Sequence, residues 1–366
     1  MGRTIAIVAN SPGNLLTFRR GLVRAFTERG DRVVLVAPDG PRVGELPLEG
    51  TTYVTLRHLR RSGLNPLRDL ALVRELTGIY RREAVTHALH FTIKPVVYGS
   101  LAARRSGAVN VSTLTGLGYA FIRGGWQAAL ARTLYRTALP SAHRVVFHND
   151  DDRRLFLQRR LCRADHAVTV GGSGLRMADF PYVDYAEADP HRVLFAGRLL
   201  VDKGVREFAE AARLVRKQRP ELNFHLVGPF DPDYPAAIST AELDRWQLAG
   251  DLSYGGVARD IRPHLRSAAL VVLPSYREGC PRVLLEAAAT GRALVGTDVP
   301  GVRRVINDRN GWLVPVRRAD LLAETILEAM GNQRRTLPAR GEQGRARVEG
   351  EFSEAVVNAA YLEWTE

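Results

Sequence analysis

The amino-acid sequence predicts an α/β protein with two doubly wound parallel-sheet domains that face each other across a cleft. Short apolar runs alternate with helical patterns along almost the whole chain, which is typical of parallel sheets covered by helices. This series is interrupted once, near the middle, and then begins again. The length of 366 residues also exceeds one ordinary hydrophobic core and suits two domains of similar size.

The first half of the chain contains the elements of one domain, which we place over residues 1–175. An apolar run opens it, and we interpret this run as a strand and not as a signal peptide, since no secretory cleavage pattern accompanies it. The expected strands span residues 4–9, 32–37, 53–56, 86–91, 109–114, 144–147 and 166–170. The expected helices span residues 15–29, 67–82, 94–105, 127–139 and 151–161.

A break in the pattern separates the two domains. It begins at Gly171-Gly-Ser-Gly174 and continues through a stretch with two prolines and little periodicity, where we place the hinge. The second domain spans residues 190–345, and a C-terminal helical segment, residues 346–366, can pack back on the N-terminal domain. The expected strands of the second domain span residues 192–196, 223–227, 252–255, 270–273, 293–296 and 312–314.

The composition is that of a soluble globular protein with a strongly basic surface. A net charge of +13 favours an anionic partner, such as nucleic acid, anionic lipid or a diphosphate substrate. No apolar run approaches the roughly 18 residues needed to cross a bilayer. The only cysteines, Cys162 and Cys280, are far apart in sequence, which excludes a disulfide framework or a cysteine metal site and fits a reducing cytosol.

Two cations follow the first expected strand of the second domain, in the segment Phe195-Ala-Gly-Arg198-Leu-Leu-Val-Asp-Lys203-Gly204. Gly197 lets the backbone turn closely, and Gly204 opens the next helix. Arg198 and Lys203 can therefore converge beside a helix N-terminus, whose amides favour anions. Each charge-assisted hydrogen bond to a diphosphate would contribute roughly 1.5–3 kcal/mol. The alternative is an ordinary surface arginine and lysine in a strand–helix loop.

Two carboxylates follow the strand at residues 270–273, in the segment Glu278-Gly-Cys-Pro-Arg-Val-Leu-Leu-Glu286. A helix should begin near Pro281, which places Glu286 little more than one turn inside it. Leucine and alanine flank Glu286, so its burial would be costly without partners, which ribose hydroxyls could supply. The alternative is an ion pair between Glu286 and Arg282, one turn earlier.

The loop that precedes this helix offers further ligands for the same substrate. Glu278 can reach a transferred sugar, and the amides of Gly279 and Cys280 can face a phosphate or sugar oxygen. With Arg198 and Lys203 beside them, these groups predict a site that holds a diphosphate through cations and sugar hydroxyls through acids. Such a site points to transfer of a sugar from a nucleotide diphosphate.

These residues resemble a known family, the retaining glycosyltransferases of family 4, which have the GT-B fold of two facing Rossmann-like domains. The resemblance covers essentially the full length. It is most similar to bacterial N-acetylgalactosaminyltransferases that extend undecaprenyl-diphosphate-linked glycans. The most specific stretches are Phe91-Thr-Ile-Lys-Pro-Val-Val-Tyr-Gly99, Thr113-Leu-Thr-Gly-Leu-Gly118, Phe147-His-Asn-Asp-Asp-Asp-Arg-Arg-Leu-Phe156 and Ser275-Tyr-Arg-Glu-Gly-Cys-Pro-Arg-Val-Leu-Leu-Glu286.

The resemblance implies a retaining enzyme of polysaccharide biosynthesis that needs neither a metal nor another cofactor. It would move a hexose or N-acetylhexosamine from a UDP-sugar to a polyprenyl-diphosphate-linked saccharide, as a peripheral protein on the inner face of the cell membrane. A front-face substitution is implied, in which a donor phosphate oxygen receives the acceptor proton. The protein then contributes positioning and stabilisation of the leaving group.

The resemblance also implies roles for individual residues. Arg198, Lys203, Glu278 and His90 would be catalytic: the two cations would hold the diphosphate, and Glu278 and, less securely, His90 would face the transferred sugar. Glu286 would hold the ribose. The other residues expected to bind the donor are Gly13, which lets the first loop approach the phosphates, Gly197, Val257 in the loop against the base, Gly279, Cys280 and Pro281.

The chain departs from the family pattern at two places. His148 stands where relatives usually have glutamine, so we assign it no role and expect a loop histidine with satisfied hydrogen bonds. Leu175-Arg176 follows Gly-Ser-Gly where an acidic or amide residue often occurs. Lys94 precedes Pro95 and could contact an acceptor phosphate or the donor sugar; the alternative is a solvent-exposed lysine at a helix start.

Two segments predict contact with a membrane surface. Residues 64–82 and 121–144 combine arginines with leucine, isoleucine, tryptophan and tyrosine. In the second segment Trp126, Leu130, Leu134 and Tyr135 can share one helix face, flanked by arginines, which fits a peripheral helix on anionic lipid. The alternative is an amphipathic core helix with a solvated basic edge.

Two other functions fit part of the sequence. A UDP-sugar epimerase shares the two-domain architecture but would release an altered UDP-sugar without an acceptor. A basic nucleic-acid-binding protein is suggested by charge alone. No recognised nucleic-acid motif and no cluster of stacking aromatics supports it, so we expect no nucleic-acid partner.

Overall fold

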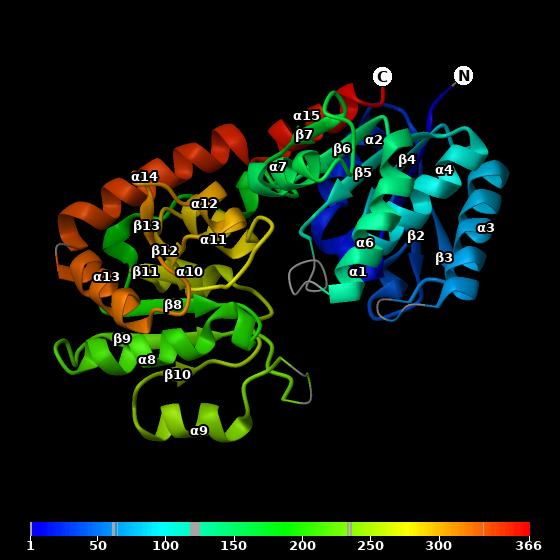
Figure 1. Cartoon of the computed structure of the whole chain (residues 1–366). Helices are drawn as coiled ribbons and strands as arrows, with labels where there is room; N and C mark the ends of the chain where they lie inside the picture. Colours follow the sequence, from blue (N-terminus) through cyan, green and yellow to red (C-terminus); the bar gives the residue numbers. More distant parts are fainter. Residues whose placement is uncertain are drawn as a thin grey trace. The chain divides into compact units, whose positions relative to one another are not determined.

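The chain forms two compact units (Figure 1). The structure, a computed structural model, describes residues 2–60, 63, 65–117, 125–232, 234, 236–331 and 333–366. The N-terminal unit contains Met1–Gly174 and Glu354–Glu366, and the C-terminal unit contains Leu175–Ser353. Leu64, Gly118 and residues 121–124, which belong to motifs named above, lie outside the described residues.

A parallel sheet of seven strands is the centre of the N-terminal unit. Its strands lie in the order β3-β2-β1-β4-β5-β6-β7. The apolar runs of the central strands are buried on both faces, as expected for a parallel sheet with helices on each side. The strands are β1 (Thr4–Val8), β2 (Arg32–Pro38), β3 (Thr51–Leu56), β4 (His87–Phe91), β5 (Val109–Leu114), β6 (Arg144–Phe147) and β7 (Ala167–Thr169).

Helices cover both faces of this sheet. One hydrophobic cluster joins it to α3 (Pro66–Arg82), α4 (Ser100–Ser106), α6 (Gly125–Ala138) and α7 (Asp150–Gln158). The other joins it to α1 (Pro12–Phe18), α2 (Arg20–Glu28) and α15 (Glu354–Glu363). The sequence predicted one helix over residues 15–29, but the structure has two. Helix α1 ends at Phe18, and the buried Arg19 separates it from α2. A π-helix, Pro95–Gly99, precedes α4.

The C-terminal unit is built on a second parallel sheet, of six strands, in the order β10-β9-β8-β11-β12-β13. Its strands are β8 (Arg192–Ala196), β9 (Asn223–Val227), β10 (Ser253–Tyr254), β11 (Leu270–Leu273), β12 (Ala293–Thr297) and β13 (Gly311–Val314). Its helices are α8 (Val205–Arg216), α9 (Thr240–Leu248), α10 (Arg262–Ser267), α11 (Arg282–Ala289), α12 (Pro300–Val305), α13 (Ala319–Gly331) and α14 (Gln333–Glu351). The predicted pair of Rossmann-like parallel-sheet domains is confirmed.

The chain crosses between the units at different residues than expected. The stretch assigned to a hinge packs on the C-terminal unit: Val183 donates its amide to the Thr290 carbonyl (3.1 Å), and the buried Arg292 donates to the Val183 carbonyl (2.7 Å). The C-terminal unit therefore begins at Leu175 and not near residue 190. It also extends to Ser353, past the expected end at residue 345, because α14 continues to Glu351.

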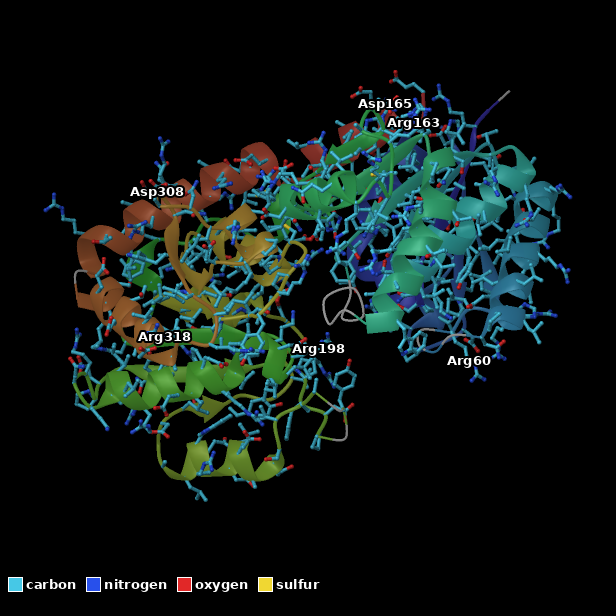
Figure 2. All side chains as sticks on the ribbon, in the orientation of Figure 1. Arg60, Arg163, Asp165, Arg198, Asp308 and Arg318 are labelled. Atoms are coloured by element: carbon cyan, nitrogen blue, oxygen red, sulfur yellow. The ribbon has the colours of Figure 1, made fainter. Side chains whose placement is uncertain are left out.

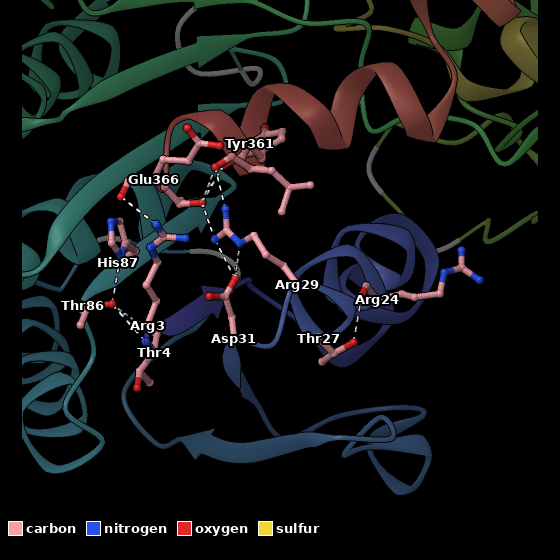
Figure 3. Close-up of polar contacts among 12 residues, drawn as sticks. Arg3, Thr4, Arg24, Thr27, Arg29, Asp31, Thr86, His87, Tyr361 and Glu366 are labelled. Atoms are coloured by element: carbon pink, nitrogen blue, oxygen red, sulfur yellow. Dashed lines mark hydrogen bonds and ion pairs between the residues drawn. The ribbon is translucent and has the colours of Figure 1, made fainter. Parts of the chain in front are cut away.

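The last residues of the chain belong to the N-terminal unit. The hydroxyl groups of Tyr361 and Thr113 lie 2.8 Å apart within its core. Arg29 donates to the Leu362 carbonyl (2.7 Å) and to Thr365 Oγ1 (2.9 Å). Figure 3 shows these contacts around Arg29, together with the bond from Arg3 to the Glu366 carbonyl. Helix α15 thus completes one face of the N-terminal sheet.

Candidate active site

The two predicted motifs leave neighbouring strands of the C-terminal sheet. Strand β8 pairs with β11, although three helices and two strands separate them along the chain. The strand order reverses at this pair, since β9 follows β8 on one side and β12 follows β11 on the other. Ligands of open α/β sheets bind at such a point, outside the carboxyl ends of the strands.

Lys203 and Glu278 meet at this position. Lys203 Nζ lies 2.5 Å from Glu278 Oε1, with 21% and 12% of the two side chains exposed. The loops that carry them are also joined, because Tyr276 donates its amide to the Asp202 carbonyl (2.8 Å) and Ser275 Oγ donates to the same carbonyl (3.1 Å). The structure therefore brings together a cation and an acid that the sequence predicts for one site.

A glycine permits this close approach of the two loops. Gly204 has φ +75°, in the left-handed region, and a Cβ there would lie 2.0 Å from the Pro274 carbonyl oxygen. Any other residue would push the loop of Lys203 away from the loop of Glu278. The glycine predicted to open the helix thus also sets the spacing of the two loops.

Further glycines line the carboxyl ends of β8, β9 and β10. Gly228 (φ +143°) lies against Gly197, where a Cβ would come within 1.9 Å of the Gly197 carbonyl oxygen. The Gly228 amide donates to the Gly256 carbonyl (2.9 Å). These glycines therefore let the loops that follow β8, β9 and β10 approach one another closely. Val257, predicted to lie against the base, follows directly and is 63% exposed.

Arg198 lies exposed at the end of β8 (Figure 2). Its guanidinium carbon is 6.0 Å from the centre of the Tyr234 ring. Within the described part of the chain it forms no ion pair with a carboxylate. Arg198 is thus a cation without a neutralising acid, close in sequence to Lys203, which has one.

Glu286 is less exposed than Arg198 and already forms an ion pair. Its carboxylate accepts a hydrogen bond from Arg282 Nε at 2.7 Å, one helical turn away. Burial raises the pKa of Glu286, and the charge of Arg282 partly opposes this. The ion pair anticipated as the alternative is therefore present, and the ribose contact stays a prediction.

The residues between the two acids fix the loop. A Cβ on Gly301, at the start of α12, would lie 2.5 Å from the Glu278 carbonyl carbon and 2.6 Å from that of Gly279, so α12 packs directly on this backbone. Pro281 is the residue before α11 and not part of its first turn, because its ψ of 113° is extended. Burial raises the pKa of the Cys280 thiol to about 12, which favours the protonated thiol at neutral pH.

Two residues predicted in the N-terminal unit have clear structural settings. Gly13 is in the first turn of α1, capped by Ser11, and nothing lies within 4 Å of where its Cβ would be. Lys94 is 16% exposed and forms an ion pair of 3.1 Å with Asp69, which also accepts a hydrogen bond from Tyr98 (2.7 Å). Lys94 is thus not the solvent-exposed lysine of the alternative, and its contact with an acceptor stays a prediction.

The structure does not place His90 for the role predicted from the sequence. The side chain is fully buried in the N-terminal core, with Nε2 2.7 Å from the Tyr80 hydroxyl and Nδ1 2.9 Å from Asn110 Oδ1. Burial lowers its pKa to about 4, so it is neutral. A Cβ on Gly99 would lie 2.2 Å from the ring, which leaves no space beside it. His90 cannot contact a sugar in this structure because both ring nitrogens face the core.

His148 also differs from its expected setting. It is 4% exposed, and its Nε2 has no hydrogen-bond partner among the described residues. Burial, with a smaller effect from the charge of Arg19, lowers its pKa to about 3. It is a buried, neutral histidine and not a loop histidine with satisfied hydrogen bonds.

The sequence interpretation missed one contact beside the site. Tyr276 donates its hydroxyl to Glu207 Oε1 on α8 (2.6 Å), and the Arg317 guanidinium lies 4.7 Å from the Tyr276 ring centre. No motif links Tyr276 and Glu207, which are 69 residues apart. The one signal was the position of Tyr276, two residues before Glu278.

Two features that the described residues lack bear on ligands and membranes. Among the described residues, no three histidine, cysteine, aspartate or glutamate side chains are grouped so that they could hold a metal ion. Over the same part of the chain, no helix combines the length and apolar character needed to cross a bilayer.

Comparison with known proteins agrees with this geometry. Residues 4–149 match the family described as "Glycosyl transferase 4-like", and residues 190–332 match "Glycosyl transferases group 1". The chain is 27% identical over 344 residues, 88% of each protein, to the N,N'-diacetylbacillosaminyl-diphospho-undecaprenol alpha-1,3-N-acetylgalactosaminyltransferase of Campylobacter jejuni.

Solved structures share the fold. The crystal structure of Anabaena HepE in complex with UDP and glucose matches with a TM-score of 0.78 and 18% identity, over 99% of this chain and 98% of that one. Sucrose-phosphate synthase of Thermosynechococcus elongatus matches with a TM-score of 0.79 and 18% identity over the same shares. The chain belongs to the group 1 glycosyltransferases of family 4, which are retaining enzymes of the GT-B fold that use nucleotide sugars.

Proposed function

We propose that this enzyme transfers a hexose or N-acetylhexosamine from a UDP-sugar to a polyprenyl-diphosphate-linked saccharide. The observation that carries the donor assignment is the meeting of Lys203 and Glu278 where β8 and β11 end, with Arg198 exposed nearby. UDP as the carrier is supported by HepE, whose crystal structure contains UDP and glucose. The acceptor is supported by the Campylobacter jejuni relative, whose name describes an undecaprenol-diphosphate-linked acceptor.

The proposed chemistry is a front-face substitution with retention. The acceptor hydroxyl oxygen bonds to the anomeric carbon as the bond from that carbon to the UDP oxygen breaks, and a phosphate oxygen of UDP takes the acceptor proton. Arg198 and Lys203 stabilise the negative charge that develops on the diphosphate. Glu278 orients the sugar through its hydroxyls, and Glu286 holds the ribose. The arginine and lysine perform the neutralisation for which other enzymes use a metal ion.

We also propose that the N-terminal unit rests on the inner face of the cell membrane. Among its described residues, four of the exposed large apolar side chains make up what we call the apolar patch: Leu67 (82%), Leu70 (43%), Ile93 (42%) and Trp126 (68%). Their elements adjoin, because α3 and α6 both contact the π-helix that follows Ile93. Arg60, labelled in Figure 2, and Arg74 are exposed on the same unit and supply positive charge for anionic lipid.

The apolar patch differs from the helix face that the sequence suggests. Tyr135 is 1% exposed and packs on Phe156 at 5.1 Å between ring centres, so it belongs to the core. Trp126, at the start of α6, is the exposed member of that set. The membrane contact therefore rests on the N-terminal ends of α3 and α6 and not on the length of α6.

One experiment tests donor and acceptor together. Purified enzyme is offered UDP-glucose, UDP-galactose and their N-acetyl forms, with a lipid-diphosphate monosaccharide as acceptor, and UDP release is measured. We expect one donor to dominate and release to need the acceptor. No release with any donor would overturn the proposal. An altered UDP-sugar formed without acceptor would favour the epimerase.

Co-sedimentation with liposomes tests the membrane contact. We expect binding to anionic vesicles that weakens with salt and falls when Leu67 and Trp126 are both changed to serine. The matched control is Leu248→Ser, which alters an 89% exposed leucine of the C-terminal unit and should bind as wild type does. Equal binding to neutral vesicles would contradict the electrostatic part, and unchanged binding of the double variant would contradict the patch.

A further inference from the structure

The ion pair between Lys203 and Glu278 joins two residues that serve different parts of the proposed donor. Lys203 is assigned to the diphosphate and Glu278 to the sugar, yet in this structure each is the other's partner, 2.5 Å apart. We propose that this pair makes the enzyme discriminate against UDP in favour of the complete UDP-sugar. This inference rests on the proposed function and adds a specificity role for Glu278.

The pair is held by backbone and not only by flexible side chains. On one side, the Asp202 carbonyl accepts from both Tyr276 N and Ser275 Oγ. On the other, Gly301 packs against the Glu278 and Gly279 backbone at a distance that excludes a Cβ. The Glu278 backbone therefore stays in place when a phosphate approaches Lys203, and the phosphate and the Glu278 carboxylate compete for one ammonium group.

The surroundings strengthen this competition. Both side chains are largely shielded from water, so their charges interact more strongly than an exposed pair would. Arg198 has no carboxylate partner within the described residues and can bind a phosphate without breaking an ion pair. Nucleotide binding is therefore opposed mainly at Lys203, because binding the phosphate weakens the ion pair between the Lys203 ammonium group and the Glu278 carboxylate.

A complete donor offsets this cost, whereas UDP does not. The hydroxyl groups of the sugar can donate hydrogen bonds to the Glu278 carboxylate. These bonds replace the hydrogen bonding that Glu278 loses when the Lys203 ammonium group also binds the phosphate. UDP brings no such donors and places its terminal phosphate near an unneutralised carboxylate. After transfer, the Lys203–Glu278 pair re-forms and favours departure of UDP, which reduces product inhibition.

The test compares UDP binding to wild type and to Glu278→Gln by isothermal titration calorimetry. Loss of the carboxylate should tighten UDP binding on the order of tenfold. This is the effect expected when an ion pair of intermediate exposure no longer has to be weakened, since such a pair contributes more than a surface pair and less than a fully buried one. The inhibition constant of UDP should fall by the same factor, while turnover also falls. Glu278→Ala should change UDP binding in the same direction, with thermal unfolding to show that both variants fold.

Glu210→Gln is the matched control, because it removes an acid paired with Arg213 (2.5 Å) on the exposed side of α8 in the same unit. It should leave UDP affinity unchanged. UDP binding by Glu278→Gln that equals or is weaker than that of wild type overturns this inference alone. Failure of wild type and every variant to bind UDP overturns the proposed donor, and this inference with it.

Discussion

Tyr276 and Glu207 connect the loop of the candidate active site to the helix behind it. The Tyr276 hydroxyl donates to Glu207 Oε1 at 2.6 Å, and no hydrogen-bond partner for Oε2 is found among the described residues. Tyr276 is therefore the one described donor to this partly buried carboxylate. The same side chain lies in the loop that carries Glu278, so this hydrogen bond fixes the position of an acid that we assign to the sugar.

Tyr276→Phe removes that hydrogen bond and keeps the ring. Leaving Glu207 without a donor should lower the free energy of unfolding of the C-terminal unit by about 1–3 kcal/mol. We expect kcat to fall because Glu278 loses its fixed position. Steady-state kinetics and urea unfolding check both effects. Tyr53→Phe is the control, since Tyr53 belongs to the N-terminal unit and its hydroxyl donates to the Ala37 and Pro38 carbonyls; equal losses in both variants would contradict a positioning role.

Arg198→Ala and Lys203→Ala should each reduce kcat/KM by roughly 100-fold or more, the usual effect of removing a group that stabilises transition-state charge. Arg318→Ala is the matched control, because Arg318, labelled in Figure 2, is 52% exposed and pairs with Asp320 on the same unit. It should behave as wild type does. Circular dichroism of each variant checks folding, and activity within threefold of wild type in either test variant would refute the assignment.

Activity should survive removal of divalent metal. The cations Arg198 and Lys203 can balance the charge of the departing diphosphate, so we expect the transfer to proceed without a metal ion. Enzyme treated with EDTA and then dialysed should retain its rate of UDP release. Loss of activity that Mn²⁺ or Mg²⁺ restores would contradict this prediction.

Stability should fall in acid because of two buried histidines. Burial lowers the pKa of His90 to about 4 and of His148 to about 3, whereas an unfolded histidine titrates near 6.5. The unfolded chain therefore takes up protons first as the pH falls below 6.5, and stability is lost toward pH 4. Each histidine should account for about 2 kcal/mol between pH 7 and pH 5. His148→Gln should reduce this pH dependence of urea unfolding; an unchanged dependence would disprove it.

Arg29→Ala should destabilise the N-terminal unit by releasing the end of the chain. Arg29 is half-buried, bonds to Leu362 and Thr365, and pairs with Asp31 at 2.6 Å. Its loss should lower the thermal midpoint by several degrees and expose the C-terminal segment to proteases. Arg24→Ala is the control, because its pair with Glu354 (3.2 Å) is more exposed and should contribute little. Identical behaviour of the two variants would contradict the anchoring role of Arg29.

The sequence predicted both sheets and the meeting of Lys203 with Glu278, because strand–helix alternation determines a parallel sheet and its carboxyl edge. The sequence could not predict that the His90 side chain lies in the core. Its strand is buried on both faces, so the sequence has no alternation of apolar and polar residues that would show which side chains are accessible. It also missed the bond between Tyr276 and Glu207. That contact joins the loop after β11 to helix α8, and only the packing of these two segments in the folded unit brings the residues together.

The return of α15 to the N-terminal sheet has a consequence for synthesis on the ribosome. The first unit to emerge lacks the helix that covers Phe91 and Thr113 until Tyr361 and its neighbours have been made. The C-terminal unit, Leu175–Ser353, has by then been made in full. A nascent chain would therefore carry an uncovered apolar surface on its earlier half until α15 has been made, and a premature stop after residue 353 would leave that surface open permanently.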